Sequence, residues 1–138
     1  FIMLPSQAIE LILKATMNSS GGEIFVLKMP AIKIIDLAKV MIDEFSSQYG
    51  YNPRTYEIKN IGKRLGEKIH EELMTPYEAK SALDLGDMYA IISPRYREES
   101  SIYYSKYTYA RNPKLTTREA ILLSKEEIKD LVKTFKND

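Results

Sequence analysis

Apolar residues recur along the chain at three- and four-residue steps in two places, and each stripe predicts an amphipathic helix. The first predicts a helix over residues 5–18, and it consists of Ala8, Ile9, Ile12, Leu13 and Thr16. The second predicts a helix from residue 33 to residue 45, and it consists of Ile34, Leu37, Ala38, Met41, Ile42 and Phe45. We expect both stripes to face the core, as the apolar side of a surface helix does.

Short runs rich in β-branched and aromatic residues predict about three strands. The runs at 23–28 and 88–93 are bounded by glycine or proline, and the run at 55–61 alternates between apolar and polar positions. Residues 67–74 follow a glycine-containing loop and are expected to form a helix.

A Ser or Thr followed three residues later by Glu is a signal for the start of a helix. This signal occurs at Thr75, Thr116 and Ser124, and it predicts a short helix after each. Together the helices and strands predict an α+β fold, a small mixed domain with about three short strands and four to six helices.

The composition is that of one globular domain. The chain has 138 residues, of which 44% are hydrophobic and 28% charged, and a net charge of +1 provides no general attraction for nucleic acid or membrane. It has no cysteine and one histidine, which excludes disulfides, thiolate zinc sites and His-rich metal sites. No apolar run approaches the roughly 20 residues that cross a bilayer, so we expect a cytoplasmic protein without membrane contact.

Several catalytic motifs are missing from the sequence. Its six glycines form neither G-x-G-x-x-G nor a P-loop, and none of its ten tyrosines is followed by Lys four residues later. We therefore expect no cofactor-binding residue, no metal ligand and no catalytic residue in this chain. His70, the only histidine, is expected to be a packed or hydrogen-bonded residue.

Residues 62–73 combine glycines with an arginine and a predicted helix start. Backbone N–H groups at a helix start and a guanidinium can bind one diphosphate together. This segment resembles the G-x-R-x-G-E-K-x-H-E-E motif of extended short-chain dehydrogenases/reductases that act on UDP-N-acetylglucosamine, the nucleotide-sugar 4,6-dehydratases and related epimerases of capsule and O-antigen synthesis. Residues 21–30 resemble the family's G-G-E-I-F-V-x-K-M-P stretch, 33–38 its K-I-x-D-L-A helix start, and 1–4 the end of its M-T-R-F-x-M segment.

The resemblance implies a division of the chain and of a longer protein. Residues 1–94 would be a nucleotide-sugar-binding lobe, and residues 95–138 a tyrosine-rich basic arm with C-terminal helices. The resemblance implies that a Rossmann lobe that binds NAD or NADP lies upstream of Phe1, which would explain why the chain opens within an apolar segment. This part alone would be inactive, and the full-length enzyme would form a homo-oligomer.

The resemblance also implies the residues that bind the UDP-sugar: Lys63, Arg64, Gly66 and Glu67. Arg64 would bind the diphosphate or ribose. Glu67 would bind ribose hydroxyls, or would only stabilise the first turn of a helix. Lys63 is either a substrate contact or a surface charge.

A different function is suggested by residues 95–118, where six basic and two acidic side chains give a local charge of +4 among five tyrosines. Basic and aromatic side chains together can bind single-stranded nucleic acid. Tyrosine and arginine are also enriched at protein interfaces, and we favour an oligomerisation arm because no RNA-binding motif is present. A non-catalytic interaction or scaffold domain is the third possibility.

Overall fold

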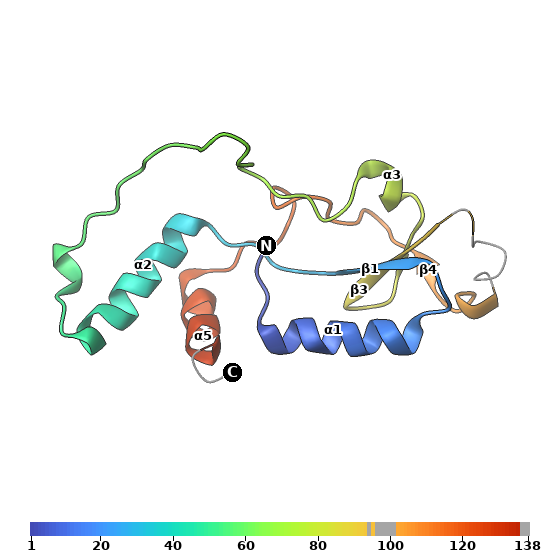
Figure 1. Cartoon of the computed structure of the whole chain (residues 1–138), viewed down its shortest axis with the longest axis horizontal. Helices are drawn as coiled ribbons and strands as arrows, with labels where there is room; N and C mark the ends of the chain where they lie inside the picture. The colour runs from blue at the N-terminus through green and yellow to red at the C-terminus, as the bar shows by residue number, and fades with distance from the viewer. Residues whose placement is uncertain (94, 96–101, 136–138) are drawn as a thin grey trace.

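The structure is a computed structural model that describes residues 1–93, 95 and 102–135. In chain order its elements are α1 (Pro5–Asn18), β1 (Glu23–Leu27), α2 (Ile34–Phe45), the 3-10 turns η1 (Ser46–Tyr49) and η2 (Pro53–Thr55), α3 (Pro76–Ala79), β2 (Ala82–Asp84), β3 (Met88–Ile92), β4 (Thr108–Tyr109) and α5 (Lys125–Phe135). These elements confirm the predicted α+β class (Figure 1).

The four strands form one antiparallel sheet in the order β1-β3-β2-β4. All five residues of β3 are buried, because the sheet has a packed cluster on each face. Tyr89 and Ile91 face one cluster with Met74, whereas Ala90 and Ile92 face the other. A strand that is covered on both faces has a continuous apolar sequence. The apolar run at β3 therefore allowed this strand to be predicted.

A second, separate core joins α2 and α5, which lie together at one end of the molecule (Figure 1). Val40 packs there against Ile128 and Val132. At its edge the Glu44 carboxylate binds the Lys129 ammonium at 2.5 Å. Extended segments lead from α2 and α5 to the sheet. These segments run side by side at Ala31 and Leu122, which form a parallel bridge.

Tyrosines from the C-terminal part of the chain hold the end of α1. The last carbonyls of a helix have no partner within the helix. The Tyr104 hydroxyl donates to the Asn18 carbonyl at 2.5 Å, and the Tyr103 hydroxyl to the Met17 carbonyl at 3.1 Å. The Tyr107 hydroxyl reaches the Asn18 side chain at 3.3 Å. Residues 103–107 are therefore bound within the chain rather than extended away from it.

The predicted strand at 55–61 is wrong. Residue 55 ends η2, and residues 56–61 belong to no sheet. The Asn52 side chain accepts a hydrogen bond from the Arg54 N–H at 3.0 Å and so turns the chain just before this run. An alternating pattern forms a strand only beside a partner, and this run is carried away from both sheet edges (Figure 1).

Two predicted helices are also wrong, for a common reason. At 67–74 and after Thr116 the chain is extended or turning, because Glu72 and Thr116 form an antiparallel bridge. The Leu73 N–H donates to the Leu115 carbonyl at 2.7 Å, and the Thr117 N–H to the Glu71 carbonyl at 2.9 Å. This long-range pairing overrides the local preference for helix.

The apolar stripes of the helices are covered unequally. On α2, Leu37 and Phe45 pack against the second core, whereas Ile34 and Met41 are exposed. On α1 the predicted core stripe is wrong within this chain, since Ile9, Ile12, Leu13 and Thr16 are all exposed.

Candidate functional site

The predicted binding residues lie on a long surface segment, residues 56–70, which we call the strap. It arches between η2 and α3 (Figure 1), and all of its residues are exposed. Its apolar side chains, Ile61, Leu65 and Ile69 among them, have no core to enter. The strap therefore presents its side chains to whatever covers it.

Arg64 begins a tight turn within the strap. The Glu67 carboxylate accepts a hydrogen bond from the Arg64 N–H at 2.8 Å, and the Glu67 N–H donates to the Arg64 carbonyl at 3.2 Å. Gly62 and Gly66 flank the turn with φ of 79° and 87°, a left-handed conformation that favours glycine. The expected helix start beside Arg64 is wrong: the structure has a glycine-flanked turn there.

The structure brings three of the four predicted residues together. Lys63, Gly66 and Glu67 line a shallow hollow on the strap, which also includes Ile34 at the start of α2. Arg64 is on the same turn but does not line this hollow. Among the described residues, no ion pair within 4.0 Å involves Lys63 or Arg64, so both cations are available to an anion.

Lys68 and His70, which follow the turn, both have side-chain partners within the chain. The Lys68 ammonium binds the Glu72 carboxylate at 3.0 Å, and this hydrogen bond raises the pKa of Lys68. His70 Nδ1 lies 3.3 Å from Thr117 Oγ1, in agreement with the expected hydrogen-bonded role.

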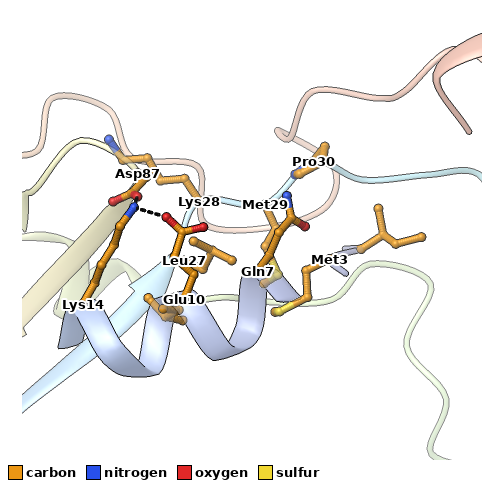
Figure 2. A pocket seen from close by; sticks show the side chains of 11 residues that line it. Met3, Gln7, Glu10, Lys14, Leu27, Lys28, Met29, Pro30 and Asp87 are labelled. Carbon is orange, nitrogen blue, oxygen red and sulfur yellow. Dashed lines mark hydrogen bonds and ion pairs between the residues drawn. The ribbon is translucent and has the colours of Figure 1, made fainter. Parts of the chain in front are cut away.

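A second cavity, of about 170 Å³, lies between the start of α1 and the end of β1 (Figure 2). Its lining consists of Ile2, Met3, Gln7, Glu10, Leu11, Lys14, Leu27, Lys28, Met29, Pro30 and Asp87. An apolar cavity of about 150 Å³ takes one benzene ring, so this cavity has room for one planar six-membered ring. The sequence signal was present in residues 27–30, but spacing alone did not show that α1 packs beside them.

The polar wall of the cavity is an ion network. Lys14 bonds to Asp87 and, at 2.8 Å, to Glu10 (Figure 2). The hydrogen bonds that Lys14 donates, above all the one to Asp87, raise the pKa of Lys14. The same bond lowers the pKa of Asp87. Lys28 is paired with Asp84 at 2.6 Å. The two lysines and three carboxylates of this network carry a net charge of −1, so the wall suits a neutral polar ring better than an anion.

The cavity and the strap hollow are neighbours along the chain. Pro30 lines the first and Ile34 the second. Four residues span at most about 14 Å, which limits the separation of these two backbone positions. In the described part of the chain, no group of three or more His, Asp or Glu side chains is arranged to hold a metal ion.

The architecture places the chain in a known structural class. The X-ray structure of Pen from Bacillus thuringiensis superposes with a TM-score of 0.81 at 36% identity, over 99% of this chain and 38% of that one. The profile of the polysaccharide biosynthesis protein family matches residues 1–93. The chain belongs to this family.

Curated relatives match almost the whole chain. A Methanocaldococcus jannaschii protein, named only as an uncharacterized membrane protein, is 40% identical over 96% of this chain and 37% of its own length. A UDP-glucose 4-epimerase of Rickettsia rickettsii is 34% identical over 98% of this chain and 38% of its own length. The chain thus spans less than two fifths of these relatives. None of the helices within the described residues is long and apolar enough to cross a membrane.

Proposed function

We propose that this chain is the nucleotide-sugar-binding lobe of an epimerase or dehydratase of polysaccharide biosynthesis, with a UDP-N-acetylhexosamine as substrate. The observation that carries the proposal is the pairing of two neighbouring features. One is a glycine-flanked turn whose cations, Lys63 and Arg64, have no ion pair among the described residues, and the other is a ring-sized cavity. The family match and the epimerase relatives support it.

The cavity suits the uracil ring. Its apolar residues, including Leu11, Leu27 and Met29, would cover the faces of the ring. The Gln7 side-chain oxygen accepts from the Leu4 N–H at 2.8 Å, which fixes the amide and leaves its NH2 group to donate to a ring carbonyl. A neutral ring needs hydrogen bonds rather than a free charge, and the closed ion network meets that requirement.

The strap turn suits the diphosphate and ribose. A guanidinium forms two parallel hydrogen bonds with phosphate oxygens, so Arg64 would bind the diphosphate and Lys63 would add a point charge. Glu67 already holds the turn through the Arg64 N–H, and its second oxygen would accept from a ribose hydroxyl. Gly66 keeps a left-handed turn and a surface without a side chain beside the ligand.

The share of this lobe in the reaction would be orientation. Holding the nucleotide at two points fixes the sugar relative to a catalytic group, which removes much of the entropic barrier. Hydride chemistry needs NAD or NADP in a glycine-rich site, and the glycines of this sequence do not fit one. We assign the cofactor and the catalytic residues to an upstream Rossmann lobe. A 4,6-dehydratase and an epimerase both fit this role, because the acids and bases that decide the outcome would lie in the upstream lobe.

The experiment is a titration of the 15N-labelled chain with UDP, followed by NMR. We expect shifts at residues 62–70 and at the cavity residues, whereas the free base uracil should shift only the cavity. Arg64→Ala should weaken UDP binding at least tenfold, since a hydrogen bond to a charged group contributes about 1.5–3 kcal/mol. The control Lys59→Ala removes the same charge from the same strap, at a lysine 3.8 Å from Glu57, and should change little.

Two results would contradict the proposal. One is the absence of shifts at both sites at millimolar UDP. The other is equal weakening by Arg64→Ala and Lys59→Ala, which would mean that the strap attracts anions only through its overall charge. A salt-dependent shift of a labelled oligonucleotide would instead favour the nucleic-acid interpretation of residues 95–118.

A further inference from the structure

A further cavity, of about 280 Å³, lies beside β3 and has no role in the proposed function. Its lining consists of Lys28, Met29, Pro30, Leu73, Tyr89, Lys114, Ala120 and Ile121. Residues 28–30 also line the cavity beside α1 (Figure 2), but every other lining residue differs, so the two cavities share one wall. An apolar cavity of about 150 Å³ takes one benzene ring, and this second cavity therefore has room for two fused rings.

Most of this lining is apolar and held by backbone pairing. Five of its eight side chains, among them Leu73 and Ile121, carry no nitrogen or oxygen atom. The Leu73 N–H donates to the Leu115 carbonyl at 2.7 Å, and the Ala31 N–H donates to the Ile121 carbonyl at 2.9 Å. Ile121 is nevertheless 76% exposed. Apolar surface of the cavity therefore faces water, and a ligand with an apolar body would gain free energy by covering it.

The charged side chains of the lining are both positive. Lys28 bonds to Asp84 at 2.6 Å, and its ammonium group lies 4.6 Å from the centre of the Tyr89 ring, so it is held in place and neutralised. Lys114 takes part in no ion pair within 4.0 Å among the described residues. Complementary charges favour one class of ligand over another. The free ammonium group of Lys114 therefore favours an anion and disfavours a cation.

We propose that this cavity binds a carboxylate with an apolar body of about the size of two fused rings. The carboxylate would lie against Lys114, and the apolar body would pack against Leu73 and Ile121. One ammonium group balances the single charge of a carboxylate, whereas a phosphate monoester carries more. A nucleotide base needs polar groups around its edge, and the apolar side chains of this lining provide none. The proposal rests on this cavity and does not depend on the binding of UDP.

The test is a titration of the 15N-labelled chain with naphthalene-2-carboxylate, followed by NMR. We expect saturable shifts at Leu73, Tyr89, Ala120 and Ile121, with a dissociation constant of about 1 mM, the affinity usual for a ligand of this size. Naphthalene-2-carboxamide has the same shape without the charge. It should bind about fivefold more weakly, the factor that one ion pair near a protein surface contributes.

Two variants separate the charge from the apolar contact. Lys114→Ala should weaken binding of the carboxylate about fivefold and leave binding of the carboxamide unchanged. The control Lys39→Ala removes the same charge from an exposed lysine of α2 that also has no ion pair among the described residues, and it should change neither affinity. Ile121→Ala should weaken both probes by the same factor, because it removes apolar contact and leaves the charge in place. Circular dichroism verifies that all three variants are folded.

Three results would overturn the proposal. The first is the absence of shifts at several millimolar naphthalene-2-carboxylate, and the second is equal affinity for the carboxylate and the carboxamide. The third is a UDP titration that shifts Leu73, Ala120 and Ile121 as strongly as the strap, since the cavity would then belong to the nucleotide site. These three residues line neither the strap hollow nor the cavity beside α1. The two proposals are therefore tested at different residues and fail independently.

Discussion

Glu23 should make the folded state sensitive to acid. Its carboxylate lies at the first residue of β1 and accepts four hydrogen bonds from the preceding turn. The donors are the Ser19 hydroxyl at 3.0 Å, the Ser20 N–H at 3.0 Å, the Ser20 hydroxyl at 2.7 Å and the Gly21 N–H at 2.9 Å. Burial raises the pKa of Glu23, but the hydrogen bonds from Ser20 and Gly21 outweigh it and lower the pKa from 4.5 to about 2.

This lowered pKa sets the size and the pH range of the effect. One pKa unit corresponds to about 1.4 kcal/mol, so the full difference gives an upper bound of about 3 kcal/mol. Water reaches the half-buried carboxylate, and we expect about 1–2 kcal/mol. A group whose pKa is lowered by folding stabilises the protein above its unfolded pKa. The stabilisation should be complete above about pH 4.5 and should disappear as the pH falls to about 2.

The perturbation is Glu23→Gln, measured by urea unfolding followed by circular dichroism at pH 7, 5, 4 and 3. We expect the variant to be less stable by about 1–2 kcal/mol at pH 7, and the difference to shrink between pH 5 and pH 3. The control is Glu57→Gln, because Glu57 is exposed and lies 3.8 Å from Lys59. A difference that stays constant across this pH range would refute the reasoning.

Two further substitutions test the packing. Ile128→Ala, in the fully buried centre of the α2–α5 core, should lower the free energy of unfolding by about 2–4 kcal/mol. Hydrogen exchange should show that amide protection falls more in α2 and α5 than in β3. The control Ile121→Ala, at an exposed isoleucine, should change the free energy of unfolding little. Tyr104→Phe removes the 2.5 Å bond to the Asn18 carbonyl and should cost about 1–2 kcal/mol in urea unfolding, more than Tyr103→Phe, whose 3.1 Å bond is exposed.

Helix starts were predictable where the signal was wholly local. At α3 the Glu78 carboxylate accepts from the Thr75 N–H at 2.7 Å, and the Glu78 N–H donates to the Thr75 hydroxyl at 3.2 Å. The same reciprocal pair opens α5 at Ser124. At Thr116 the same residue types form only a turn, because Thr116 forms a bridge with Glu72 and residues 121–123 pair with the segment at Ala31. A local signal therefore predicts a helix only where no distant segment competes for the backbone.

The candidate site, too, was predictable only where its signal was local. Glycines around Arg64 indicated a loop, and the structure has a left-handed residue at Gly62 and at Gly66. The extended conformation after the loop depends on the bridge between Glu72 and Thr116. No pattern in the sequence between these two residues predicts that bridge. Strands β2 and β4 were missed because two or three residues are too few to show a period.

The strap explains why this lobe alone should bind its ligand weakly. Ordering a residue costs about 1–2 kcal/mol of backbone entropy, and residues 56–70 bury no apolar side chain in this chain that would offset it. A nucleotide bound at Arg64 would have to supply that free energy, which lowers its observed affinity. Only a partner that covers Ile61, Leu65 and Ile69 would order the strap in advance and tighten nucleotide binding.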